Sequence, residues 1–159
     1  MAQKVTPCLW FDGQAEQAAA HYVSIFPSSE VLETTRYGPD QPGPEGQVMT
    51  VGFRLGGHRF VGLNGGPQFT FSEATSFQVV CDDQAEVDYF WERLGDGGEP
   101  GPCGWLKDRF GVSWQVIPSV LIALVTDADE ARAQRATQAM LKMGKLDIAG
   151  LVRAADGDG

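Results

Sequence analysis

Cysteine and histidine are scarce in this chain of 159 residues. The three cysteines, Cys8, Cys81 and Cys103, are odd in number, far apart and without C-x-x-C spacing, so the sequence predicts neither a disulfide framework nor a zinc knuckle. Such thiols fit a reducing compartment, and we expect a cytoplasmic protein. The two histidines, His21 and His58, fall on a predicted buried helix face and in a glycine turn, and we expect structural roles for both.

Long apolar runs and a surplus of basic residues are missing too. No segment approaches the roughly 18 apolar residues of a membrane span, and the N-terminal residues lack the apolar run of a signal peptide. Twelve basic residues stand against 21 acidic ones, which gives a formal charge of −9. Phosphate backbones and anionic lipid surfaces repel such a polyanion. We therefore expect a soluble protein with no nucleic-acid partner and no membrane partner.

An internal repeat occupies the first 120 residues. The sequence Asp-Gly-Gln-Ala-Glu at residues 12–16 recurs 70 residues later as Asp-Asp-Gln-Ala-Glu at residues 82–86. Each copy follows a short segment, residues 6–11 and 76–81, whose Val, Phe, Trp and Leu residues predict a strand. The same piece of structure is therefore predicted to begin twice.

Each copy also opens a predicted helix. Asp83 and Glu86 have the spacing of a capping box, in which side-chain oxygens satisfy the free N–H groups of the first helical turn. The second helix then shows a core stripe with the spacing of one buried face. Its members are Val87, Phe90, Trp91 and Leu94. With a slip of one residue, the first helix matches it with Ala18, His21, Tyr22 and Ile25.

Three strand-like segments follow each helix. In the first half they are residues 30–37, 49–55 and 59–64, the last two joined by a Gly-Gly hairpin turn. In the second half residues 95–102 make a poor, glycine-rich strand, and residues 103–107 and 112–118 make a hairpin. Both halves therefore predict the order βαβββ. The tail has a period near 3.6 and predicts a helix from Asp127 to Gly144 and a shorter one at residues 146–155.

Four segments resemble the PhnB-like proteins, often described as 3-demethylubiquinone-9 3-methyltransferase domain proteins. They are residues 6–13, 63–67, 103–115 and 145–149. The resemblance implies membership of the vicinal-oxygen-chelate superfamily, which includes glyoxalases, bleomycin-resistance proteins and extradiol dioxygenases. It implies an α+β fold in which two βαβββ modules form a curved mixed sheet around a pocket, with a C-terminal helical extension.

The resemblance also gives expected boundaries within a single domain of residues 1–159. Module 1 spans about residues 1–70, module 2 about residues 71–118, and the helical extension about residues 119–155.

Metal-using members of the superfamily take His or Glu ligands from the first and last strands of each module. By the resemblance, these positions fall at Val5 or Pro7 and at Gly62 in the first module, and at Ser76 and Gln115 in the second. None of these side chains is the imidazole, thiolate or carboxylate that zinc or iron prefers. We expect no catalytic metal and no cofactor.

Polar side chains alternate along two strands of the second module. Ser76 and Gln78 share one face of their strand, and Ser113 and Gln115 share one face of theirs. Such a face can be the wet side of a sheet, and the pattern alone leaves that alternative open. The resemblance favours a pocket lining. The expected ligand pocket consists of Ser76, Gln78, Ser113, Gln115, Asn64, Trp105 and Pro7, and no catalytic residue is predicted.

Several of these residues have a second interpretation. Asn64 equally fits a turn at the end of a strand, and aromatic residues such as Trp105 often fill cores. Cys103 fits an inert thiol better than a nucleophile, because no histidine lies near it in sequence. The run from Lys107 to Arg109 has the composition of a charged hairpin turn.

The leading functional hypothesis is a metal-independent small-molecule-binding protein that forms a homodimer. The dimer follows from the habit of the family and from apolar tail residues, Met140, Met143, Ile148 and Val152. The alternative is an enzyme, a lyase, isomerase or transferase, acting on a small aromatic or 2-oxo compound, and a third possibility is an antibiotic-sequestering binder. The methyltransferase description lacks the glycine-rich turn of a Rossmann-like cofactor site, since residues 12–14 fit a helix cap instead.

Overall fold

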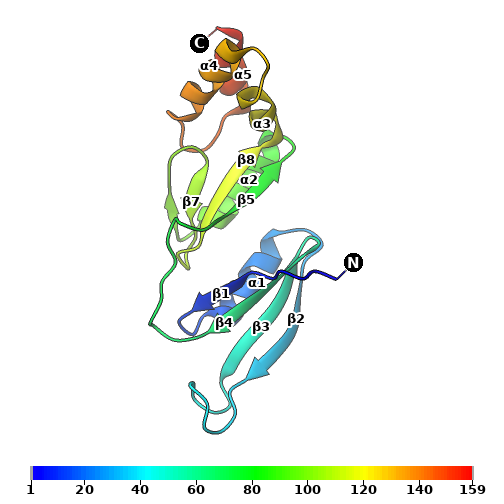
Figure 1. The fold of residues 1–159 in the computed structure, drawn as a ribbon, viewed down its shortest axis with the longest axis vertical. Helices are drawn as coiled ribbons and strands as arrows, with labels where there is room; N and C mark the ends of the chain where they lie inside the picture. The colour runs from blue at the N-terminus through cyan, green and yellow to red at the C-terminus, as the bar shows by residue number, and fades with distance from the viewer. Residues whose placement is uncertain (1, 159) are drawn as a thin grey trace. The chain divides into compact units, whose positions relative to one another are not determined.

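The computed structural model describes residues 2–158, and these divide into two compact units with the boundary between Phe71 and Ser72. Each unit contains one open, four-stranded mixed sheet with one helix between its first two strands (Figure 1). The predicted α+β class and the two βαβββ modules are therefore confirmed. The second unit also carries the C-terminal helices.

The first unit follows the predicted order. Its elements are β1 (Cys8–Phe11), α1 (Ala15–Ile25), β2 (Glu30–Arg36), β3 (Val48–Leu55) and β4 (His58–Asn64). The strands lie in the order β1-β4-β3-β2, with β1 parallel to β4 and the other pairs antiparallel.

The core of the first unit lies between α1 and one face of its sheet. Side chains alternate along β3, so Val51, Phe53 and Leu55 point to the helix and are buried. Phe53 stacks on Phe60 of β4 with ring centroids 5.4 Å apart, and Tyr22 of α1 is fully buried beside them. The alternating pattern in the sequence therefore predicts this face correctly.

The second unit repeats the topology of the first. Its elements are β5 (Ser76–Cys81), α2 (Gln84–Gly95), β6 (Glu99–Pro100), β7 (Trp105–Lys107) and β8 (Ser113–Pro118). They lie in the order β5-β8-β7-β6, with β5 parallel to β8. The poor strand predicted for residues 95–102 is reduced to two residues, because glycines interrupt it.

Helix α2 begins at the predicted cap. The Asp83 carboxylate accepts from the Glu86 N–H at 2.9 Å, and the Glu86 carboxylate accepts from the Asp82 N–H at 2.7 Å. One free donor of the first turn and the N–H of the residue before the cap are thereby satisfied from within the same pentapeptide. The expected stripe is buried at Val87, Phe90 and Leu94 and half-buried at Trp91.

The tail forms three helices, α3 (Ser119–Val125), α4 (Glu130–Met140) and α5 (Ile148–Asp156). The sequence patterns did not predict α3 as a separate helix, because residues 116–125 form an almost continuous apolar run that fits a strand or a helix. Pro118 separates the two structures at the N-cap of α3. Helix α4 is also shorter than expected. Among residues 2–158, no helix combines the length and the apolar character needed to cross a bilayer.

The three helices share a small core of their own at one end of the second sheet (Figure 1). Leu146 is fully buried in this core, and the Gln84 side chain of α2 fixes it by donating to the Leu146 carbonyl and accepting from the Ile148 N–H. Met140, Met143 and Val152, which the sequence suggested for a dimer contact, pack partly buried against the same core.

Backbone hydrogen bonds join the tail to the loop before β7. The Cys103 N–H donates to the Met143 carbonyl at 2.7 Å, and the Gly104 N–H donates to the Gly144 carbonyl at 2.8 Å. Gly104 has a positive φ, and a Cβ at this position would lie 3.0 Å from Leu146 Cδ1. The tail is therefore fastened to the second unit through this loop.

Replacing Leu146 with alanine should lower the free energy of unfolding by about 2–5 kcal/mol, because the site is fully buried and the substitution leaves a cavity. Val5→Ala is the control, since Val5 is 82% exposed and its truncation should change stability by less than about 0.5 kcal/mol. Urea denaturation measures both, and equal losses would contradict the docking of the tail.

Candidate functional site

The two faces of the second sheet differ. Helix α2 covers one face, where Trp114 and Val116 are buried. The opposite face brings together five of the seven predicted pocket residues through the strand register. Ser76 pairs with Ser113, Gln78 pairs with Gln115, and Gln115 pairs with Trp105 on its other side.

Three of these side chains form a neutral hydrogen-bond network. Gln115 Nε2 donates to Ser76 Oγ at 2.7 Å, and Gln78 Nε2 donates to Gln115 Oε1 at 3.3 Å. Uncharged amide and hydroxyl groups are poor ligands for zinc or iron, and here they already bond to one another. The residue chemistry at these strand positions therefore does not fit a transition-metal site.

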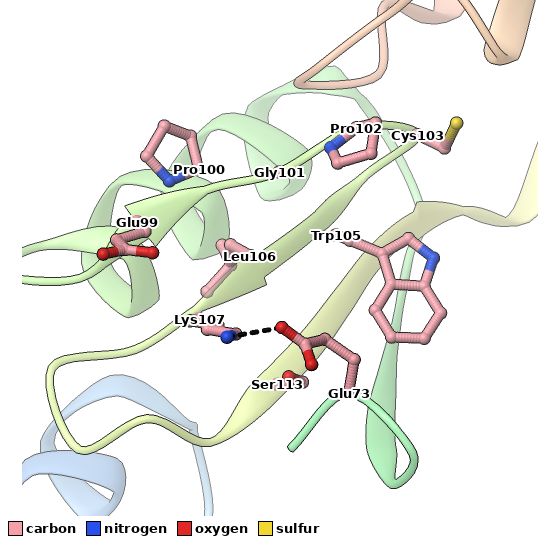
Figure 2. A pocket seen from close by; sticks show the side chains of 10 residues that line it. All are labelled: Glu73, Glu99, Pro100, Gly101, Pro102, Cys103, Trp105, Leu106, Lys107 and Ser113. Carbon is pink, nitrogen blue, oxygen red and sulfur yellow. Dashed lines mark ion pairs between the residues drawn. The ribbon is translucent and has the colours of Figure 1, made fainter. Parts of the chain in front are cut away.

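The second unit contains a cavity of about 450 Å³ (Figure 2). Of the predicted pocket residues, Ser113 and Trp105 line it, whereas Ser76, Gln78 and Gln115 do not. Its wall is largely apolar, with Trp105 and Leu106 from β7 and Pro100 and Pro102 from the segment before it. Charged and polar groups are few. They are Glu73, Glu99, Lys107 and Ser113.

Ser113 is the polar residue most enclosed in this wall. It is 1% exposed, and its Oγ has no hydrogen-bond partner within residues 2–158. A buried hydroxyl without a partner costs roughly 1–3 kcal/mol of desolvation, so native proteins rarely leave one unsatisfied. A polar group that enters the cavity would recover this cost.

Lys107 lies across from Ser113 on the neighbouring strand and forms an ion pair with Glu73 (Figure 2). The hydrogen bond from Lys107 lowers the pKa of the Glu73 carboxyl. The same bond raises the pKa of Lys107, and the charge of Glu99 adds to that rise. Both groups are therefore charged at neutral pH.

Asp108 lies in the predicted charged hairpin turn between β7 and β8 and is buried there. Asp108 is 3% exposed, and its Oδ1 accepts from the N–H groups of Phe110 and Val112 at 2.8 and 3.0 Å. Its Oδ2 accepts from the Trp114 indole at 2.8 Å. The carboxylate thus organises the turn between β7 and β8, while Arg109 is exposed and pairs with Asp96.

Comparison with known proteins decides the family. The profile of the family described as 3-demethylubiquinone-9 3-methyltransferase matches residues 3–117. A solved structure described as a putative 3-demethylubiquinone-9 3-methyltransferase, PhnB protein, from Bacillus cereus is 35% identical, with a TM-score of 0.66. The match covers 74% of this chain and 100% of that one. The chain belongs to this PhnB-like family.

Two more distant structures share the fold. Protein PA1353 from Pseudomonas aeruginosa is 21% identical with a TM-score of 0.61, and the match covers 74% of this chain and 98% of that one. The fosfomycin resistance protein FosX from Mesorhizobium loti is 14% identical with a TM-score of 0.53, and the match covers 74% of this chain and 91% of that one. Both structures share the fold of the two βαβββ modules. No curated protein matches the sequence.

The family profile ends before the helical tail of this PhnB-like protein. Residues 145–149, part of the resemblance seen in the sequence, lie outside the matched residues 3–117. The residues that line the cavity of the second unit lie within residues 3–117.

The remaining predicted residues of the PhnB-like chain belong to the first unit. Asn64 Oδ1 accepts from the Ala15 N–H at 2.8 Å, and its Nδ2 donates to Glu16 and to the Val48 carbonyl at 2.6 and 3.1 Å. Asn64 borders a separate cavity of about 650 Å³, but all three of these bonds are made inside the fold. They support the structural interpretation of Asn64.

Pro7 and Gly62 also have structural surroundings. The Pro7 carbonyl accepts from the Val61 N–H at 2.9 Å, and Pro7 is half-buried. A Cβ on Gly62 would meet the Ala15 Cβ at 3.2 Å, so this position faces α1 and not the open side of the sheet. Gly62, where the resemblance places a ligand position of the family, therefore faces the helix, because the register puts Val61 and Leu63 on the open side.

The cysteines and histidines show no built catalytic group. Burial raises the pKa of the Cys81 thiol to about 12, which keeps it protonated and unreactive. Cys103 borders the cavity of the second unit, and His58 is exposed at its turn. Within residues 2–158, no three His, Cys, Asp or Glu residues gather as a metal site would require.

Among the cavity residues that sequence reasoning missed in this PhnB-like protein are the three charged ones, Glu73, Glu99 and Lys107. The sequence contained a signal for Lys107. In the predicted hairpin Lys107 pairs with Ser113, which was already a candidate pocket residue. Glu73 had none, because it lies in a turn before β5 and no periodic pattern connects it with Lys107.

Replacing Asp108 with asparagine should lower the free energy of unfolding by about 1–3 kcal/mol, because an amide NH₂ would face one of three buried N–H donors. Asp96→Asn makes the same chemical change on a side chain that is 74% exposed, and should cost less than about 1 kcal/mol. Thermal or urea denaturation compares the two. Equal stability of both variants would refute the organising role of Asp108.

Proposed function

We propose that this chain is a metal-independent binding protein and that the cavity of its second unit holds a small, flat, largely apolar molecule. The observation that carries the proposal is the buried, unpartnered Ser113 hydroxyl in the wall of a cavity of about 450 Å³. Ligand pockets commonly measure about 300–1,000 Å³ and combine apolar walls with a few polar groups that orient the ligand. Trp105 supplies the flat apolar surface.

The chemistry of the donors supports binding without a metal ion. Ser76, Gln78 and Gln115 are neutral and bonded to one another, so they offer neither charge nor free lone pairs in the arrangement that zinc or iron requires. Metal analysis of protein purified without chelators checks this point. Near-stoichiometric zinc, iron or manganese held at Ser76 or Gln115 would overturn it.

The family description names a methyl transfer, but this chain does not have the features of a Rossmann-like cofactor site for that reaction. Such a site needs a parallel sheet with a glycine-rich turn leading to a free helix N-terminus. Both sheets here are mixed, and Asn64 already occupies the Ala15 N–H at the start of α1. We therefore infer that the chain binds a ligand and does not transfer a methyl group through such a site. If a bound compound were converted to a product, the alternative of a lyase, isomerase or transferase would be favoured.

The binding proposal predicts that 2-naphthamide, a flat neutral probe, binds the full-length protein. Trp105→Ala should weaken this binding at least about tenfold, because a buried aromatic anchor commonly contributes 2 kcal/mol or more to binding. Trp91→Ala is the matched control, since Trp91 lies on α2, which covers the opposite face of the sheet. Calorimetric titration measures the affinities, and equal affinities of both variants would place the ligand elsewhere.

We also propose that the protein is a cytoplasmic homodimer. The cysteines are free thiols, which suits a reducing compartment, and disulfide-linked cysteines in rapidly alkylated cell extracts would count against it. The tail leaves Leu141 and Ile122 60% and 48% exposed, and we infer that a second copy of the chain covers them.

Light scattering at micromolar concentration should give the mass of a dimer, and Leu141→Asp should shift it toward the monomer. A monomer mass for the unmodified protein would contradict the homodimer.

A further inference from the structure

The charged groups of the cavity have an uneven arrangement. Of the described residues that line it, Lys107 alone is cationic, and it stands opposite Ser113 on the paired strands β7 and β8. Figure 2 shows the Lys107 ammonium and the Ser113 side chain on either side of the Glu73 carboxylate. One ammonium and one unsatisfied hydroxyl therefore converge where a carboxylate already lies.

Glu73 reaches this position from outside the sheet. It belongs to the turn that precedes β5, and its side chain is 60% exposed. A rotation of this side chain would carry its carboxylate into solvent without moving a strand. An exposed ion pair of this kind is weak, because water screens the two charges, so a competing carboxylate on an apolar body can replace it.

We propose that Lys107 and Ser113 form an oxyanion-binding corner, that Glu73 occupies this corner in the ligand-free protein, and that a small aromatic carboxylate displaces it on binding. The inference rests on the proposed function and names its ligand class. The ligand carboxylate takes the place of Glu73 beside Lys107, and the Ser113 hydroxyl gains the partner that it lacks.

The charges of the whole chain restrict how this corner works. The formal charge of −9 repels anions, and Glu99 is a second carboxylate in the cavity wall. Recognition therefore depends on direct contact with the Lys107 ammonium, since the general field opposes it. Outward movement of Glu73 leaves one carboxylate and one ammonium in the wall, and the ligand adds the second negative charge that Glu73 had supplied.

The test compares 2-naphthoate with 2-naphthamide, which have nearly the same shape and differ in charge. Calorimetric titration of the full-length protein gives both affinities. Lys107→Met should weaken naphthoate binding about tenfold and leave naphthamide within about twofold. Glu73→Gln should strengthen naphthoate binding up to about fivefold, because the internal competitor loses its charge, with naphthamide again unchanged.

Two control variants isolate the role of Glu73. Glu99→Gln removes the same charge from the same cavity and should strengthen naphthoate binding less than Glu73→Gln does. Lys145→Met removes a lysine from an ion pair with Asp88, neither of which lines the cavity, and should leave both affinities unchanged. Amide resonances of residues 72–75 should shift with naphthoate and not with naphthamide.

The outcomes separate this inference from the function beneath it. Suppose that naphthamide binds, but that the affinity for naphthoate does not change with Lys107→Met or changes equally with Glu73→Gln and Glu99→Gln. The oxyanion-binding corner is then wrong, and the proposed binding function stands. If neither probe binds the unmodified protein, the proposed function fails for this ligand class together with the corner.

Discussion

The Asp108 carboxylate is the constraint on which the candidate site depends. One buried carboxylate satisfies two backbone N–H groups of the turn and the indole N–H of Trp114. These bonds set where β8 begins and therefore which residue stands opposite Lys107. A slip of one residue would turn Ser113 and Gln115 toward α2 and bring Trp114 to the open face. The polar network, the cavity wall and the pairing of Lys107 with Ser113 all require this register.

The duplicated topology is achieved by different means in the two units. Helix α2 is capped from within its own segment by Asp83 and Glu86, whereas the first N–H of α1 is satisfied by Asn64, 49 residues away. In the first unit, an asparagine at the end of β4 therefore caps the helix. In the second unit the cap is local, so the end of β8 is not needed to cap α2.

The sequence was most informative where periodicity governs structure. Alternation along β3 and the stripe of α2 predicted both cores, and the motif likeness predicted the family. It was less informative where long-range contacts decide. The charged hairpin turn was predicted, but nothing local shows that Asp108 is buried in it. Glu73 reaches Lys107 from a turn that has no sequence pattern. Helix α3 was hidden because its apolar run continues from β8 without a change of composition.

The two backbone hydrogen bonds from Cys103 and Gly104 to Met143 and Gly144 have a mechanical consequence. Cys103 borders the cavity, while Met143 and Gly144 belong to the tail, outside the residues 3–117 that the family profile matches. The tail is therefore mechanically coupled to the rim of the cavity. Substitutions in the tail can change the shape of that rim while every residue that lines the cavity stays the same.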